Sequence, residues 1–597
     1  MKIINIIAIS FTMMLIACNG ETQNITEVES PSIDEFFQEF TEDWIRINPQ
    51  LAVRTQYFPE GEKDQLSRQM TPFATEEWER NRIILAQHGL EQLSNFDRAL
   101  LTDEHRLSAD MMQWQLQNVV DSEQFLDYDY PFQQMNGVNI GFANYLTVIY
   151  PIFTERDAEN YIAVLSQLRE RIEAAIIKSE EQVANGIVPP RFILEATINS
   201  MEIFIDPEPS DNPLVTAFAE KLEAIEEVDA TRKTQLLNEV IALVDSEVYP
   251  VWQEVIDTLF SQQDRATDDA GLWRFEAGET LYAQRLQTFT TTDLSPDEIH
   301  EIGLREVARI EQEMDGLFRQ LGYNEGSISE RVAQLTVDTS YPNTDAGREL
   351  IMSDIQSLLS DALTRTEGSF EVRPQSEVIA QPYPEFRWAS AAASYSAPPA
   401  DGSRPGIFQM PLRQSQLTQV GLRSLVYHET VPGHHFQVAL AVENKNLPAF
   451  RSLRALGGIS ASSEGWALYA ERFAAEDGWY DDDPVGRLGQ LDSELFRARR
   501  LVVDTGLHAM GWTRQQAIDY GIEASEIERY VVMPGQATSY MIGQLKIIEL
   551  RERAREALGE NFSLQEYHNL VLETGIVPLE ILERVVDRYI DETLASI

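Results

Sequence analysis

Cysteine and lysine are both scarce in this 597-residue chain. The only cysteine is Cys18, so no disulfide can form within the chain. Lysine supplies 7 of the 47 basic residues, and 97 acidic residues give a formal charge of −50. That charge excludes a general nucleic-acid-binding surface and a basic patch for anionic lipids, because both need clustered Lys and Arg. We interpret the acidic, lysine-poor composition as solubility in a salty medium.

Long apolar runs are also missing, apart from one short run at the start of the chain. Residues 3–17 are apolar, but the run is too short for a membrane span and ends in Leu-Ile-Ala-Cys at Cys18. This ending resembles a bacterial lipobox, in which 1–17 is a signal peptide and Cys18 is lipidated. Asn19 allows sorting to the outer membrane under the usual rule, and 18–31 forms a polar tether. We therefore expect a soluble body on a lipid anchor that faces the periplasm. An ordinary cleaved signal with an incidental cysteine is the alternative.

The remaining chain, 32–597, reads as a single large domain that is mostly α-helical. Apolar residues recur at three- and four-residue spacings in 33–47 and 158–183, and a cap followed by Pro and acidic residues opens a helix over 296–321. Residues 369–413 are rich in Pro, Ser and Ala and contain short β-like pieces, which predicts one small sheet. A hydrophobic fraction of 43% is sufficient for a large core.

The segment 428–437, HETVPGHHFQ, is the most distinctive string in the sequence. It begins with His-Glu, as does the HExxH zinc helix, in which two His four residues apart bind the metal and Glu is the general base. Here the second His is His434 or His435, six or seven residues after His428. On an unbroken helix, position i+6 points about 120° away and i+7 lies about 10 Å along the axis. Neither could then share a metal ion with His428.

Pro432 and Gly433 resolve this difficulty, because they predict a break in the helix. Pro432 cannot donate to the helix ladder, and its ring clashes with the carbonyl group four residues earlier. Gly433 permits backbone angles that are closed to other residues. A break at 431–433 can bring the second His beside the first. The other histidines outside the 428–508 window are taken as structural: His88, His105, His300 and His568.

A zinc site that keeps one coordination position open has three protein ligands, so a third ligand is needed beside the two histidines. The segment 460–471 offers two glutamates on a predicted helix. Glu464 is the predicted third ligand, because the serines before it can cap a helix and Gly465 leaves room beside it. Glu471, further along the same face, is a weaker candidate or a partner that orients a ligand. The predicted metal site thus lies within 428–464.

These strings resemble a bacterial family of zinc-peptidase-like proteins that is catalogued as a domain of unknown function. The resemblance rests on HETVPGHHFQ, on SSEGWALYAE at 462–471, and on further segments of the second half of the chain: 292–300, 401–408, 503–512 and 534–544. The family in turn resembles the helical gluzincin peptidases of the angiotensin-converting-enzyme and oligopeptidase group. This resemblance implies two helical halves around a deep channel, with the small sheet beside the metal site. It also favours His434 over His435 as the ligand.

The same resemblance suggests which side chains hold the oxyanion of a tetrahedral intermediate. By order and residue type, His508 and Tyr540 match the His and Tyr that gluzincins use for this purpose. Asp504, four residues before His508 on a predicted helix, could fix the tautomer of that imidazole. The alternatives are a His satisfied within the core and a core aromatic residue with a bonded hydroxyl group.

Substrate contacts are predicted before the metal segment. Residues 406–410 are expected to form an edge strand that pairs with an extended peptide, with Phe408 among its substrate contacts. Arg404 could bind a substrate carboxylate through a bidentate fork, or it could tie down the Pro-rich loop. Three further arginines are expected in ion pairs: Arg497, Arg499 and Arg500.

The sequence therefore predicts a zinc-dependent peptidase that acts on short peptides in the periplasm. Zn²⁺ would be held by His428, His434 and Glu464. It would polarise the scissile carbonyl group and lower the pKa of bound water. Glu429 would take the proton from water and pass it to the leaving amine. One alternative is a non-catalytic lipoprotein that contains zinc and binds peptides or partners. Another is a metal-dependent hydrolase of a different amide or ester. Cys18 would be the only membrane attachment, and the sequence carries no oligomer signal.

Overall fold

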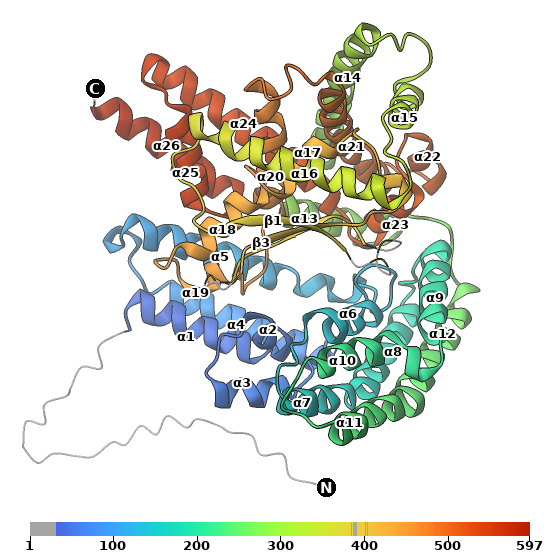
Figure 1. The fold of residues 1–597 in the computed structure, drawn as a ribbon. Coiled ribbons are helices and arrows are strands. Elements are labelled where there is room, and N and C mark those ends of the chain that lie inside the picture. The colour runs from blue at the N-terminus through green and yellow to red at the C-terminus, as the bar shows by residue number, and fades with distance from the viewer. Residues whose placement is uncertain are drawn as a thin grey trace, which may run out of the picture.

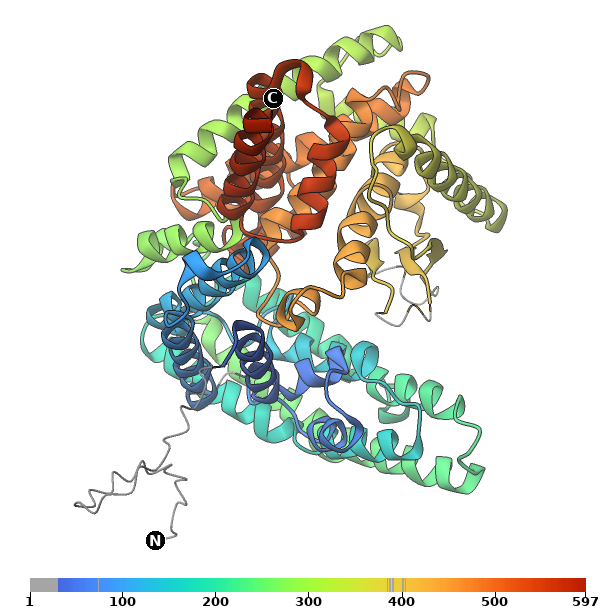
Figure 2. The same cartoon turned by 90° about the vertical axis from the view of Figure 1, so that its left-hand side faces the viewer.

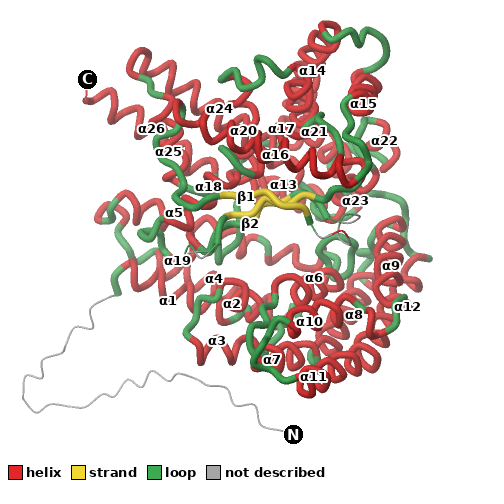
Figure 3. Tube along the Cα trace, in the orientation of Figure 1, coloured by secondary structure: helices red, strands yellow, loops and turns green. Residues whose placement is uncertain are grey.

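The structure of the chain is a computed structural model that describes residues 31–73, 75–383, 385, 388, 391–399, 402 and 404–596. Within these residues the chain is mostly helical with one small sheet, which confirms the predicted fold class. Figure 3 shows the strands in the middle of the molecule, surrounded by helices. None of the described helices is both long and apolar enough to cross a membrane. The predicted signal peptide, Cys18 and all but the last residue of the tether lie outside the described residues.

The helices fall into two parts, which Figure 1 colours from blue to green and from green to red. The first part contains α1 (Ile33–Arg46), α2 (Pro49–Thr55), α3 (Glu60–Ser67), α4 (Glu76–Leu93), α5 (Asp103–Asp121), α6 (Val138–Asn144), α7 (Glu155–Leu165), α8 (Leu168–Ala184), α9 (Arg191–Ile205), α10 (Pro213–Glu223), α11 (Ala230–Leu243) and α12 (Tyr249–Gln263).

The second part carries the sheet and the remaining helices. Before the sheet come α13 (Gly278–Thr290), α14 (Pro296–Gln320), α15 (Ile328–Asp338) and α16 (Asp345–Arg365). After it come α17 (Leu422–Glu429), α18 (His434–Glu443), α19 (Ala449–Ser452), α20 (Ser460–Glu476), α21 (Pro484–His508), α22 (Arg514–Asp519), α23 (Ala524–Val532), α24 (Ser539–Leu558), α25 (Leu564–Thr574) and α26 (Leu579–Ser596).

Local sequence signals explain where several helices begin. Ser32 before α1 and Ser295 before α14 each form a capping box with the glutamate three residues later. The aromatic residues predicted for the core of α1 are buried: Phe36, Phe37, Phe40 and Trp44. The single helix predicted over 158–183 is instead two helices, α7 and α8, which are separated by 166–167. Apolar periodicity continues through this corner because both helices pack on the same core.

The two parts are joined by a shared core and separated by cavities. Helices α6–α12 bury their own apolar cluster, whereas α1, α4 and α5 share a cluster with the sheet and the C-terminal helices. Figure 2 shows the two parts stacked on each other. Cavities of about 550, 350 and 270 Å³ are lined by residues of both parts, and neighbouring cavities share lining residues. The resemblance implies a channel between two helical halves around the metal site, but none of His428, His434 and Glu464 lines these three cavities.

The sheet has three strands in the order β1-β3-β2. β1 (Val378–Pro382) is parallel to β3 (Gly406–Met410), and β2 (Ser394–Ser396) is antiparallel to β3. The prediction that 406–410 is an edge strand is therefore wrong, because β3 is hydrogen-bonded on both sides. Residues 371–373, at the start of the region where the sequence predicts short β-like pieces, are not a strand, and the backbone N–H of Val372 donates instead to the side chain of Asn569 (3.0 Å).

Candidate metal centre

The helix break that the sequence predicts lies between α17 and α18. α17 ends at Glu429, a turn follows, and α18 begins at His434. The N–H of Gly433 donates to the carbonyl oxygen of Tyr427 (3.0 Å), so the chain folds back against the end of α17. A Cβ atom at position 433 would lie 2.0 Å from the carbonyl oxygen of His428. Only glycine fits this turn. His428 lies in the helix before the turn and His434 begins the helix after it, so the turn brings the two histidines together.

His428, His434 and Glu464 converge at one point, as predicted. The Nε2 atom of His428 lies 3.5 Å from Oε2 of Glu464, and the Nε2 atom of His434 lies 3.6 Å from the same oxygen. One donor atom from each of the three side chains falls within 4.8 Å of the others. The two imidazole planes stand at 85° to each other, with ring centres 4.8 Å apart. Two His nitrogens and one carboxylate oxygen form a donor set typical of a three-ligand zinc site.

Helix α20 brings Glu464 to this point, and its packing explains Gly465. A Cβ atom at position 465 would lie 2.5 Å from the Cα atom of Gly543 in α24, so α20 and α24 touch backbone to backbone. The indole N–H of Trp466 donates to the carbonyl oxygen of Pro432 (3.0 Å), which ties α20 to the turn between the two histidines. Glu464 is therefore held between α24 on one side and the α17–α18 turn on the other.

Glu471 lies two helical turns after Glu464 and contacts the other nitrogen of His428. Its Oε1 atom is 2.7 Å from Nδ1 of His428, and the side chain is 1% exposed. Its Oε2 atom accepts hydrogen bonds from the hydroxyl groups of Ser424 in α17 and Ser493 in α21. Of the two roles that the sequence left open, Glu471 has that of an orienting partner, because it fixes the imidazole with Nε2 facing Glu464.

Glu429 is buried beside the candidate ligands without a bonding partner. It is 8% exposed, and no hydrogen bond or ion pair involves its carboxylate among the described residues. Its negative charge raises the pKa of the adjacent His428. A buried carboxylate that is not bonded to protein is costly unless another group, such as water or a cation, occupies the site.

The electrostatics of the centre favour a cation. Burial alone would lower the pKa of His428, but Glu464 and Glu471 outweigh burial and raise that pKa to about 10. Burial would likewise raise the pKa of Glu464, yet the two histidines lower it well below its ordinary value. The three carboxylates at the centre belong to Glu429, Glu464 and Glu471. This concentration of negative charge attracts a positive ion.

His435, the alternative ligand, is used elsewhere. Its Nδ1 atom is 2.9 Å from the hydroxyl group of Tyr395 in β2, and its Nε2 atom donates to the carbonyl oxygen of Ser376 (3.0 Å). With both ring nitrogens bonded and the side chain 2% exposed, His435 attaches α18 to the sheet. His434 is therefore the histidine that faces the centre, which agrees with the resemblance.

The role predicted for His508 is corrected by its surroundings. Its Nε2–H donates to the carbonyl oxygen of Tyr530 (3.0 Å), and its Nδ1 accepts the N–H of Leu272 (3.3 Å). The side chain is 1% exposed, so neither nitrogen is free to bind an oxyanion. Asp504 does not orient His508 either, because its carboxylate accepts from the hydroxyl group of Tyr282 and the N–H of Gly535. The alternative reading, a satisfied core histidine, is the one the structure supports.

The oxyanion role of Tyr540 stays a prediction. It lies in the first turn of α24, three residues before the glycine that touches α20, and it is partly exposed. Its hydroxyl group has one long contact, 3.5 Å from a guanidinium nitrogen of Arg529. The guanidinium group of Arg500 lies 4.6 Å from the centre of its ring. Tyr540 thus has a fixed ring and a weakly bonded hydroxyl group.

The predicted ion pairs are correct for two of the three arginines. Arg499 pairs with Glu311 (2.9 Å) and Arg500 with Glu526 (2.9 Å). Arg497 forms no ion pair with the described residues and donates instead to the hydroxyl group and the carbonyl oxygen of Ser493. It lines a cavity of about 590 Å³ that also reaches His428 and Glu471.

Of the two residues predicted to contact substrate, Phe408 is buried and Arg404 is exposed. Phe408 is completely buried at the centre of the sheet, so the prediction that it contacts substrate is wrong. The alternating pattern of β3 indicated a strand but not which neighbours would cover it. Arg404 is exposed and donates to the carbonyl oxygen of Pro405 (3.2 Å). It remains a candidate for substrate binding.

Sequence reasoning missed the groups that hold the centre in place from a distance. Ser424 and Ser493 support Glu471, and Tyr395 supports the histidine that follows His434. Ser424 precedes His428 by one helical turn, which is the one signal that could have placed it on the same face. Ser493 and Tyr395 come from distant segments, and no spacing links them to the centre.

Comparison with known proteins places the chain in a family. Residues 55–586 match the family described as bacterial protein of unknown function, DUF885. The chain belongs to DUF885. A crystal structure of a candidate lipoprotein from Colwellia psychrerythraea is similar to this DUF885 protein at 32% identity, over 93% of this chain and 99% of that chain, with a TM-score of 0.84.

A second solved structure extends the comparison of DUF885 folds. It is a candidate lipoprotein of unknown function from Shewanella oneidensis, 18% identical over 93% of this chain and 99% of that chain, with a TM-score of 0.69. At this identity the likeness concerns the fold alone. No curated protein matches this DUF885 chain.

Proposed function

We propose that this DUF885 protein is a metal-dependent hydrolase, a zinc peptidase that cleaves short peptides. The observation that carries the proposal is the convergence of His428, His434 and Glu464 beside Glu429. Three separate helices supply the three donor atoms, and the helix break at Gly433 serves to bring the two histidines together. The donor set fits zinc, which binds His nitrogen and carboxylate oxygen and keeps a further position open in catalytic sites.

When bound, zinc supplies Lewis acidity, which polarises a carbonyl oxygen and makes water more acidic. The protein supplies the orientation of the donors. Glu471 holds His428 through Nδ1, and the backbone contact between α20 and α24 fixes Glu464. Such outer partners maintain the ring orientation and basicity that ligand histidines need.

Glu429 is the proposed general base. It follows His428 in α17, so its side chain points about 100° around the helix from that ligand and stays outside the donor set. Its carboxylate has no bonding partner in the described protein and can accept a proton from water and return it to the leaving amine. This arrangement supports an enzyme over a structural zinc protein, because a structural site has no use for a base beside its ligands.

Two further groups fit a peptide substrate. The hydroxyl group of Tyr540 is weakly bonded and could donate to the developing oxyanion, which is worth roughly a few kcal/mol in a site that excludes water. Of the sheet edges, β1 is covered by α16, whose Gln356 donates to the carbonyl oxygen of Ala380 (3.0 Å). Among the described residues β2 pairs with β3 alone, and the hydroxyl group of its Tyr395 is hydrogen-bonded to His435, next to His434. An extended peptide could pair with β2.

We also propose that the protein is anchored by a lipid at Cys18 and faces the periplasm from the outer membrane. The proposal rests on the lipobox-like end of the apolar run and on Asn19 after it. The description of the Colwellia psychrerythraea relative as a candidate lipoprotein supports it. Such an anchor would place the hydrolase where short peptides pass through the periplasm.

Metal analysis and a substrate screen test the proposed activity. The purified chain should contain about one zinc ion per molecule and should cleave members of a short-peptide library. A chelator should abolish cleavage, and added zinc should restore it. Absence of zinc from a carefully prepared wild-type protein would overturn the proposal. Cleavage of esters without cleavage of peptides would change the substrate class and leave the metal chemistry in place.

A further inference from the structure

Away from the metal centre, three arginines that have no ion pair with the described residues line the cavity of about 550 Å³ between the two parts of the molecule. We call it the arginine cavity. It is lined by Arg54 at the end of α2, Arg82 of α4, and Arg454 in the loop before α20. Of the described residues that line it, none is Asp or Glu. This is unexpected in a chain in which acidic residues outnumber basic ones by 97 to 47.

The three arginines have no ion pairs or side-chain hydrogen bonds within the described protein. Most of the other described arginines are bonded to carboxylates or to carbonyl groups. Arg54 and Arg454 are exposed residues, so a ligand can reach both of them. Although part of the Arg54 side chain is exposed, the surrounding protein partly desolvates its guanidinium group and lowers its pKa, and the positive charge of Arg454 lowers that pKa further. The two guanidinium groups therefore repel each other, and an anion between them would relieve this repulsion.

Arg82 has a different setting from the other two. Its guanidinium group lies 5.8 Å from the ring centres of both Trp44 and Trp78. It also lines a neighbouring cavity with Glu79 and Asp129, but Glu79 already pairs with Lys178 and Asp129 with Arg285. The charges nearest to Arg82 are thus neutralised by other partners. Arg54 and Arg454 form the part of the cavity that lacks any compensating negative charge.

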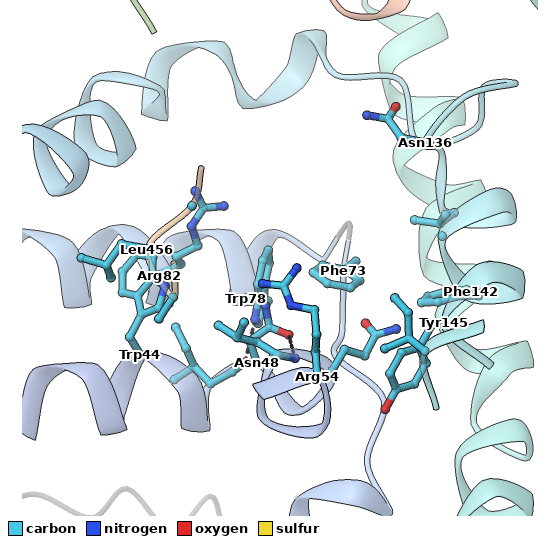
Figure 4. Close-up of a pocket in the computed structure, with 18 of the residues that line it drawn as sticks. Trp44, Asn48, Arg54, Phe73, Trp78, Arg82, Asn136, Phe142, Tyr145 and Leu456 are labelled. Carbon is cyan, nitrogen blue, oxygen red and sulfur yellow. Dashed lines mark hydrogen bonds between the residues drawn. The ribbon is translucent and has the colours of Figure 1, made fainter. Parts of the chain in front are cut away.

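The remaining wall of the arginine cavity is aromatic and neutral. Figure 4 shows Trp44, Asn48, Arg54, Trp78 and Arg82 on one side and Asn136, Phe142 and Tyr145 on the other. Two buried atoms of the wall have no hydrogen-bond partner, the Oε1 atom of Gln50 and the hydroxyl group of Tyr145. Tyr145 is 3% exposed.

We propose that the arginine cavity binds a carboxylate that is carried by an aromatic or aliphatic group. Arg54 and Arg454 hold the carboxylate, because guanidinium groups match its two oxygens in a bidentate geometry. Trp44, Phe73 and Phe142 contact the apolar part of the ligand. A cavity of this size, mostly apolar with a few polar groups, is typical of small-molecule sites. The carboxylate can come from the end of a peptide or from a free aromatic acid.

The experiment is a calorimetric titration of the full-length chain in detergent. The probes are 3-phenylpropanoate, its neutral counterpart 3-phenylpropanamide, and N-acetylphenylalanine as a mimic of a peptide terminus. Arg54→Gln and Arg454→Gln are compared with Arg265→Gln, an exposed arginine without an ion pair that does not line the arginine cavity. All titrations are repeated with a chelator, so the result does not depend on the metal centre or on hydrolysis.

Both carboxylates should bind, and the amide should bind at least about 10-fold more weakly, because charged hydrogen bonds are lost. Each of Arg54→Gln and Arg454→Gln should weaken carboxylate binding about 10-fold, while Arg265→Gln should bind like wild type. Tighter binding of N-acetylphenylalanine would assign the carboxylate to a peptide end, and tighter binding of 3-phenylpropanoate would assign it to a free acid. Equal affinity for acid and amide, or unchanged binding in both cavity variants, would overturn the proposal.

Discussion

The carboxylate of Glu471 lies 2.7 Å from Nδ1 of His428 and leaves Nε2 of that ring facing Glu464. The two glutamates are seven residues apart on α20, so a single helix provides both the candidate third ligand and the group that aligns the first. Helices α17 and α21 each add a serine to Glu471. The candidate centre is therefore built in two layers, and Glu471 and Ser424 of the outer one are each only 1% exposed.

Glu429 and Glu464 should respond differently to the same substitution. Glu429→Gln should keep about one zinc ion per chain and lose a factor of about 10²–10⁴ in peptide turnover, because it removes only the base. Glu464→Gln should lose zinc and activity together. Zinc content and turnover of a short-peptide library are measured side by side for both variants. Wild-type turnover in Glu429→Gln would rule out the base assignment, and undiminished zinc in Glu464→Gln would place the third ligand elsewhere.

Removing the outer layer should weaken metal binding without removing a ligand. Glu471→Gln is expected to lower zinc affinity about 10–100-fold, because His428 loses the acceptor that fixes its orientation. Glu476→Gln, on the same helix but paired with Arg472 and Arg551, is the matched control. Competition with a chromogenic chelator gives the affinities. Equal affinities for the two variants would show that Glu471 does not support His428.

The turn between the histidines should not tolerate a side chain. Gly433→Ala places a methyl group 2.0 Å from the carbonyl oxygen of His428, so the turn must move by about 1 Å. A displacement of this size should reduce turnover about 100-fold. Gly458→Ala is the control, because its added Cβ has no heavy atom within 4 Å. Turnover of the two variants is compared after their folding has been checked by circular dichroism.

The resemblance assigns His508 and Tyr540 to the same oxyanion role, but substitutions of the two residues should have different effects. His508→Ala leaves the N–H of Leu272 and the carbonyl oxygen of Tyr530 unpaired, which should cost about 2–5 kcal/mol of unfolding free energy. Turnover by the folded protein should stay unchanged. Tyr540→Phe should preserve stability and lower turnover about 10²–10³-fold. Urea denaturation and turnover are measured for both, and a catalytic defect in stable His508→Ala would contradict this assignment.

Cys18 should determine where the protein resides. Cys18→Ser is expected to release the chain from the membrane fraction or to leave it with its signal peptide attached, because serine cannot carry the thioether-linked lipid. Fractionation and mass measurement of the N-terminus check the outcome. Ala17→Gly, which keeps a small residue before the cysteine, serves as the control. A serine variant that is processed and sorted like wild type would refute the anchor.

The sequence was sufficient for those parts of the site that depend on local rules. Pro432 and Gly433 indicate the helix break because one removes a donor and the other removes a Cβ atom. Once the break is accepted, the identities of His428, His434 and Glu464 follow from ligand chemistry and resemblance. The capping residues Ser32 and Ser295 likewise identify two helix starts.

The parts that failed depend on distant contacts. The sequence shows that 406–410 is a strand, but strand order depends on which segments pair with it, and Phe408 is enclosed by both neighbours. His508 has the residue type and order of a catalytic group, yet both of its ring nitrogens are hydrogen-bonded to backbone groups of Tyr530 and Leu272. The arginine cavity combines α2, α4 and a loop that follows them by several hundred residues, so no local pattern could indicate it.

The contact between Gly465 and Gly543 has a mechanical consequence. Because α20 and α24 meet without intervening side chains, a shift of one helix would be passed directly to the other, and these two helices carry Glu464, Glu471 and Tyr540. Arg54 and Arg82 belong to the other part of the molecule, whereas Arg454 lies in the loop that leads into α20. A ligand that drew Arg54 and Arg454 together would pull on that loop and, through α20, on the metal centre. Occupation of the arginine cavity would then change, through this loop, the alignment of the side chains at the metal centre.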